Sequence, residues 1–136
     1  MWFVLGLLIA SLHAADLQTP GHGTPLRKEV LDGLRATQMF THLSQEFHSP
    51  IVFENVTLRV SGNWAWVVAS PTWTDGKNKG EPVSCLMRNA GAKWLLVDQT
   101  GEEVALADNP EAAFNKWRLK ILKTHGDIPP ELIPTR

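Results

Sequence analysis

The sequence of 136 residues contains no tyrosine and only one cysteine, Cys85. A single cysteine excludes a disulfide within the chain, so the fold has to be held by a hydrophobic core, for which about 120 residues suffice. Cys85 lies in an alternating apolar run with no histidine or basic residue next to it. We therefore expect a buried, unreactive thiol that packs as a small hydrophobic side chain.

An excess of charge of either sign is also missing, because 13 basic residues stand against 14 acidic ones. Such a balance gives no field that would attract nucleic acid, so we expect no nucleic-acid partner. The basic residues concentrate near the end of a predicted C-terminal helix, where the helix dipole and solvation favour cations. They are Lys116, Arg118, Lys120 and Lys123.

Sequence motifs of catalysis and metal binding are absent too. The chain has no C-x-x-C, H-x-x-x-H or G-x-S-x-G pattern, and no glycine-rich phosphate loop follows a predicted strand. His42, His48 and His125 are spaced too widely to predict a ligand set. The sequence therefore predicts no metal, no cofactor and no catalytic residue, and it favours a protein that is not an enzyme.

What is present at the N-terminus is the pattern of a secretory signal peptide. Residues 1–15 hold an apolar run followed by small residues, and the first charge is Asp16. The run is too short to span a bilayer stably, and cleavage is expected after Ala14 or Ala15. We therefore expect an exported protein, periplasmic or extracellular, with a linker at 16–23 and a single α+β domain at 24–136. The lack of a disulfide favours a bacterial envelope.

Helical spacing of apolar residues predicts one long helix over residues 24–47. Thr24 is a candidate N-cap and Pro25 occupies the first helical position. The apolar stripe shifts near Thr37, which leaves a bend or a break open there. A short C-terminal helix is expected to begin at Pro110 and to end near Gly126.

Residues 56–73 are typical of a β-hairpin, because Gly62-Asn63 is a two-residue loop with glycine first, as in a type II′ turn. That turn places Ser61 opposite Trp64 and fixes the two faces of the hairpin. One face carries Val56, Leu58, Val60, Ala65, Val67 and Ala69, with Val56 opposite Ala69. The other carries Thr57, Arg59, Trp64, Trp66 and Val68.

A second hairpin is predicted over residues 83–97, with Met87 opposite Trp94. In that register Cys85, Met87, Trp94 and Leu96 share one face, and Ser84, Leu86, Leu95 and Val97 share the other. Both faces are largely apolar, so the sheet needs cover on both sides. The predicted fold class is α+β, with one long N-terminal helix packed on a four-stranded antiparallel meander and a short C-terminal helix.

Three interpretations remain open for the tryptophan face. Trp64 and Trp66 pack under the C-terminal helix with Arg59 stacked on Trp66, or they form a partner interface, or together with Trp73 they make an exposed platform for a flat ligand. The candidate residues for binding a ligand or partner are Trp64, Trp66, Arg59 and Trp73.

The order of a helix followed by a meander resembles the cystatin-like and NTF2-like shapes. Several short motifs also look like those of small uncharacterised exported bacterial proteins, a group that implies no activity. These are residues 31–35, Phe53 and Val56, residues 62–65, Lys93-Trp94 and the proline-rich tail.

The resemblance to cystatins extends to Val60 and Gly62, which match part of their first inhibitory loop, whereas the glutamine of that loop and the Pro-Trp pair of the second are missing. The resemblance to NTF2-like enzymes implies acids, histidine and often tyrosine in a cone between helix and sheet. This chain has no tyrosine, and Asp32 and Asp98 are the acids to examine there.

The leading hypothesis is an exported, non-enzymatic binding or interaction domain that uses the tryptophan-rich sheet face. Its partner would be an envelope protein, a small ligand or a second copy in a homodimer. The alternatives are a small NTF2-like hydrolase or isomerase with a pocket between helix and sheet and, less favoured by the residues, a cystatin-like protease inhibitor.

Overall fold

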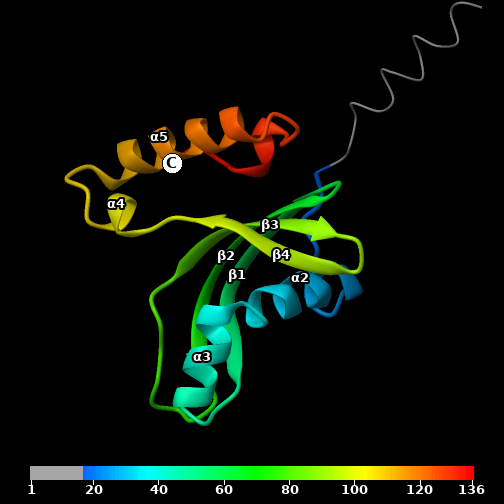
Figure 1. The fold of residues 1–136 in the computed structure, drawn as a ribbon, viewed down its shortest axis with the longest axis vertical. Helices are drawn as coiled ribbons and strands as arrows, with labels where there is room; N and C mark the ends of the chain where they lie inside the picture. Colours follow the sequence, from blue (N-terminus) through cyan, green and yellow to red (C-terminus); the bar gives the residue numbers. More distant parts are fainter. Residues whose placement is uncertain (1–16) are drawn as a thin grey trace, which may run out of the picture.

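A computed structural model describes residues 17–136, and the signal peptide expected at residues 1–15 lies outside the described residues (Figure 1). The chain is α+β, with a four-stranded antiparallel sheet in the order β1-β2-β3-β4. Two helices lie on one face of the sheet, and a third helix lies on the other with the end of the chain (Figure 1). The elements are α2 (Pro25–Arg35), α3 (Gln38–Glu46), β1 (Ile51–Ser61), β2 (Trp64–Trp73), β3 (Val83–Ala90), β4 (Lys93–Gln99), α4 (Glu102–Ala105), α5 (Pro110–Thr124) and η1 (Pro130–Leu132). Across residues 17–136, every helix is too short or too polar to cross a bilayer.

The predicted single N-terminal helix is wrong, because the chain breaks between α2 and α3. Thr37 is extended, with φ −62° and ψ 151°, and its Oγ1 donates a hydrogen bond to the Leu34 carbonyl oxygen at 2.9 Å. A threonine hydroxyl that binds the backbone in this way competes with the helical hydrogen bonds. The break allows Leu34 of α2 and Phe40 of α3 to face the same side of the sheet.

The two helix starts agree with the sequence, and so does the end of the last helix. Thr24 caps α2 by accepting a hydrogen bond from the Arg27 N–H at 3.4 Å, and Asn109 caps α5 by accepting one from the Ala112 N–H at 3.2 Å. α5 ends at Thr124, close to the predicted end near Gly126, and its 15 residues make it the longest helix of the described chain although the predicted fold class calls it short.

The register of the first hairpin is confirmed from its turn down to the pair Thr57 and Val68. Gly62 has φ +57°, which the first position of a type II′ turn requires. The register then shifts by one residue, so that Asn55 and Val56 together face Ala69 in a β-bulge.

The second hairpin forms, but its predicted register is wrong by two residues. Met87 pairs with Leu96, whereas Trp94 pairs with Asn89. The reason is the position of the turn, in which Gly91, with φ +74°, and Ala92 form the loop between the paired Ala90 and Lys93. A second bulge follows between Leu86 and Met87, further from the turn. Since side chains alternate with a period of two, a shift of two residues leaves each side chain on its predicted face.

The sheet separates two hydrophobic cores, as its two apolar faces require. The α2–α3 core holds Val30, Leu34, Phe40, Ile51, Phe53, Leu58, Val60, Ala65, Val67, Ala69, Trp73, Cys85, Met87 and Trp94. The α5 core holds Trp64, Trp66, Leu86, Val104, Phe114, Trp117, Ile121, Ile128, Leu132 and Ile133.

Candidate functional site

The four residues predicted to bind do not share one surface. Trp64 and Trp66 belong to the α5 core, with 3% and 1% of their surface exposed, whereas Trp73 lies in the α2–α3 core. Trp73 is nine residues beyond Trp64 on the same strand, and an odd separation places it on the opposite face. There its ring meets Phe47 at 5.0 Å, and its Nε1 donates to the Ser44 hydroxyl at 3.1 Å.

Trp66 packs beneath α5, as the first of the three interpretations predicts. Its ring centroid lies 6.0 Å from that of Phe114 and 5.7 Å from that of Trp117. Both rings come from the buried side of α5, where Ile121 follows one turn later. The tryptophan face is therefore covered in this structure rather than open to solvent.

Trp64 lies at the rim of the same face, where its indole nitrogen reaches a polar cluster. Nε1 donates a hydrogen bond to the Asp127 carboxylate at 3.0 Å. The Arg88 guanidinium lies 5.1 Å from the Trp64 ring, and the His125 ring lies 5.3 Å from it. The Trp64 hydrogen bond, with Arg88 and His125 adding to it, lowers the pKa of Asp127 below its usual 3.8.

The rest of the cover comes from the C-terminal tail, residues 128–136, which turns back after α5 (Figure 1). Three apolar side chains of the tail enter the α5 core: Ile128 is 4% exposed, and Leu132 and Ile133 are fully buried. η1, which ends at Leu132, makes one turn in the tail, and the Leu132 N–H donates to the Pro129 carbonyl oxygen at 3.0 Å. The tail is thus seated on the sheet face rather than lying loosely along it.

Arginine side chains from two elements hold the main chain of this tail. Arg59 Nη2 on β1 donates to the Glu131 carbonyl oxygen at 2.6 Å, a different contact from the expected stacking on Trp66. From α5, Arg118 Nη2 donates to the Pro130 carbonyl oxygen at 2.6 Å, and Arg118 Nε donates to that of Ile133. Hydrogen bonds from a charged donor are stronger than neutral ones.

The last residue of the tail is held by a paired contact. Asn115 on α5 accepts from the Arg136 N–H at 3.0 Å and donates to its carbonyl oxygen at 2.9 Å. The Arg136 guanidinium lies 3.9 Å from the Phe114 ring and donates to the Ser84 hydroxyl at 3.2 Å. Asn115, Arg118 and Ser84 are site residues that the sequence analysis missed.

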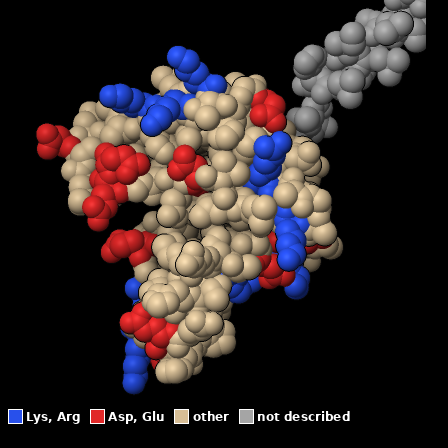
Figure 2. Space-filling model, viewed as in Figure 1, with Lys and Arg blue, Asp and Glu red and all other residues tan. Residues whose placement is uncertain are grey.

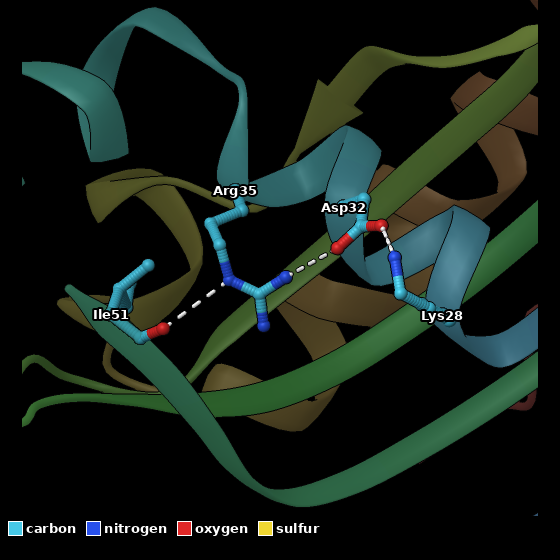
Figure 3. Close-up of polar contacts among 4 residues, drawn as sticks. All are labelled: Lys28, Asp32, Arg35 and Ile51. Carbon is cyan, nitrogen blue, oxygen red and sulfur yellow. Dashed lines mark hydrogen bonds and ion pairs between the residues drawn. The ribbon is translucent and has the colours of Figure 1, made fainter. Parts of the chain in front are cut away.

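The two acids of the enzyme hypothesis have other contacts. Asp32 lies on the exposed side of α2, where it accepts from Lys28 Nζ at 2.6 Å and from Arg35 Nη1 at 2.7 Å (Figure 3). Arg35 Nε also donates to the Ile51 carbonyl oxygen at 3.3 Å, so this chain of contacts ties α2 to β1 (Figure 3). Asp98 is half-buried on β4 and accepts from the Gln99 N–H at 2.7 Å.

The space between the helices and the sheet is filled by apolar side chains. Among the buried residues of the α2–α3 core, Cys85 alone has a titratable group, and burial raises the pKa of its thiol to about 12. A thiol that is protonated at neutral pH is a poor nucleophile. No group of three metal-ligating side chains comes together within residues 17–136.

An open groove of about 670 Å³ is lined by residues of α2 and of the edge strand β4, beside the place where the two elements meet. Its lining residues are Glu29, Asp32, Gly33, Ala36, Thr37, Gln38, Ala92, Lys93, Trp94, Leu95 and Leu96. Leu95 is 52% exposed there. Figure 2 shows Lys and Arg as well as Asp and Glu on the face of the molecule in view, so neither sign of charge dominates that face.

Comparison with known proteins leaves this geometry to be interpreted by itself. No protein-family model matches the chain, and neither a curated protein nor a solved structure matches it.

Proposed function

We propose that this chain is an exported, non-enzymatic binding domain of cystatin-like or NTF2-like shape, and that it acts through the α5-side face of its sheet. The residues of this face that would meet a ligand are Arg59, Trp64 and Trp66. The partner would be an envelope protein or a small ligand.

One observation carries the proposal: this face already holds a segment of the chain, the C-terminal tail with its single turn η1, by side-chain contacts to its main chain. Arg59 and Arg118 donate to three carbonyl oxygens of the tail, and two of its apolar side chains are fully buried in the core that holds Trp64 and Trp66. Peptide-binding faces combine these two features, because hydrogen bonds to the main chain supply affinity and pockets for side chains supply specificity.

The face also retains unused hydrogen-bonding capacity. Arg59 Nε is buried without a hydrogen-bond partner among the described residues. A buried donor without a partner costs free energy, and an acceptor on a ligand would remove that cost. A ligand that replaces the tail would therefore have at least one contact to gain.

Intrinsic fluorescence tests the proposal, since Trp64 and Trp66 would report a change of cover. The mature protein is titrated with glycans, lipid vesicles and peptidoglycan fragments while the emission maximum is followed. We expect one class to shift the emission, and we expect Trp64→Phe with Trp66→Phe to abolish most of that shift. Trp73→Phe, on the opposite face, is the matched control and should preserve it.

The proposal fails under two results. Either no class shifts the emission, or the shift persists undiminished in the Trp64→Phe, Trp66→Phe variant.

A further inference from the structure

The C-terminal tail has the composition of a peptide ligand. Its central run is Pro129-Pro130-Glu131-Leu132-Ile133-Pro134. Prolines fix φ and so lower the conformational entropy that a peptide loses on binding. Leu132 and Ile133 are buried in the α5 core, whereas Glu131 and Pro134 on either side of them are exposed.

Most contacts that hold the tail do not depend on its sequence. Carbonyl oxygens of Pro130, Glu131 and Ile133 accept from the two arginines, and any residue would present the same oxygen. Asn115 likewise pairs with the backbone N–H and carbonyl of the last residue. Sequence dependence therefore rests on the apolar side chains, on the prolines and on the Arg136 guanidinium, which contacts Phe114 and Ser84.

The connection between α5 and the tail is a short exposed turn. It consists of His125, Gly126 and Asp127, and a Cβ added to Gly126 would meet no atom within 4 Å. At this turn the side-chain contacts that hold the tail in place are those of Trp64 with Asp127 and His125. The tail could leave the face by opening this turn, with no strand removed from the sheet.

From these contacts we propose that the α5-side face recognises a proline-rich apolar peptide of a partner protein, with the pattern Pro-Pro-x-Leu-Ile-Pro and the single turn that η1 makes in the tail. The tail is then the resident occupant which this peptide displaces. The inference rests on the proposed function, and it names the ligand class. The partner peptide would take the two arginine contacts and place its two aliphatic side chains over Trp64 and Trp66.

The test uses the full chain with a tail that cannot seat. In Leu132→Asp with Ile133→Asp, two carboxylates would have to enter the α5 core, so the tail should leave the face. We expect a red-shifted tryptophan emission and a lower Tm. A synthetic peptide of residues 127–136 with the natural sequence, added in trans, should reverse both changes.

Two further peptides test whether the face recognises the pattern Pro-Pro-x-Leu-Ile-Pro or whether the natural peptide only refills the α5 core. One changes only the exposed positions, Glu131 and Thr135, and should bind within about threefold of the natural peptide. The other carries Leu132→Asp and Ile133→Asp and should bind at least about tenfold more weakly. In the receptor, Arg118→Ala should weaken the natural peptide about tenfold, because it removes two charge-assisted hydrogen bonds.

A second form of the chain covers the case in which the double variant does not fold. A protease site placed in the exposed turn is cut after folding, so that the natural tail stays bound without a covalent tether. A short tether supplies an effective concentration of the order of millimolar. Cutting it should therefore lower the concentration of free peptide that is needed to displace the tail. Exchange of a labelled tail peptide measures that displacement.

Results in two places would overturn the inference. The first is that the peptide changed only at Glu131 and Thr135 does not exchange with the cut tail. The second is that only the natural sequence restores the double variant. Either result would show that the tail is a part of the core and not a displaceable ligand. Neither result touches the proposed function, because the same chains can be titrated with glycans and lipids, and a response there would retain binding by this face with another ligand.

Discussion

Gly33 of α2 packs directly against the backbone of Trp94 in β4. A Cβ built on Gly33 would lie 2.4 Å from the Trp94 carbonyl oxygen and 2.9 Å from its Cβ. Both distances are too short for a real side chain, and the nearest atom belongs to backbone, which cannot move aside as a flexible side chain can. The absence of a side chain at Gly33 therefore sets how closely α2 approaches β4.

Gly33→Ala should destabilise the fold by about 1–3 kcal/mol, because the new methyl group forces α2 away from the sheet. The sign is diagnostic, since glycine to alanine in an exposed helix stabilises by up to about 1 kcal/mol. Urea unfolding measures the change. Gly21→Ala is the control, because a Cβ there meets no atom within 4 Å, and it should leave the midpoint nearly unchanged. A Gly33→Ala chain as stable as the parent would contradict this packing.

Arg118→Ala should lower the free energy of unfolding by about 1–3 kcal/mol, because it leaves two tail carbonyl oxygens without their charged donor. Amide hydrogen exchange should show faster exchange at Leu132 than in the parent chain. Lys120→Ala, an exposed cation on the same helix, should stay within about 0.5 kcal/mol. Equal effects of the two substitutions would mean that Arg118 acts only through its charge.

Asp127 should make stability depend on pH in the acid range. Its pKa is lowered in the folded chain, so its contribution is fully present above the usual 3.8 and is lost as the pH falls through the folded pKa. The difference in free energy of unfolding between parent and Asp127→Asn should therefore be constant near pH 7 and shrink as the pH falls below 3.8 and through the folded pKa. The exposed carboxyl of Glu54, changed to glutamine, controls for the loss of one negative charge. A difference that grows on acidification would reverse the assigned direction.

Cys85 should resist thiol reagents in the folded chain. With a pKa raised to about 12, roughly one thiol in ten thousand is ionised at pH 8, against about a quarter for an ordinary cysteine of pKa near 8.5. Burial blocks access as well. Labelling with a disulfide reagent at pH 8 should be slow in buffer and rapid in 6 M urea, on the order of a hundredfold or more apart. Equally fast labelling in both would show an accessible thiol.

The sequence predictions that the structure confirms rest on local features, namely the turn residues and the alternation of side chains along a strand. The Gly62-Asn63 turn determines the first hairpin because a two-residue loop permits few geometries, and the alternation of side chains then assigns Trp64 and Trp66 to one face. The second hairpin also has a two-residue loop, Gly91-Ala92 between the paired Ala90 and Lys93. The predicted pair of Met87 with Trp94 centres the turn one residue too early, so its register was wrong by two residues while its faces were right. The two bulges depend on how all the strands pair, so the local sequence did not predict them.

The cover of the tryptophan face was foreseen only in part. The helical spacing of Phe114, Trp117 and Ile121 indicated α5, but the contribution of the tail depends on contacts over long sequence separation, such as Arg59 with Glu131. Arg118 looked like one of several solvated cations at a helix end, and nothing local distinguishes it from Lys120. The pair Leu132 and Ile133, two aliphatic residues bracketed by prolines, was the available signal.

The division of the cores has a consequence for synthesis of the chain. The α2–α3 core is complete once β4 has been made, because its members all precede residue 97. The α5 core needs residues from 104 to 133, so a nascent chain has a sheet with one finished face while Trp64 and Trp66 still lack their cover. During that interval the uncovered face is the part of the growing chain most in need of a chaperone.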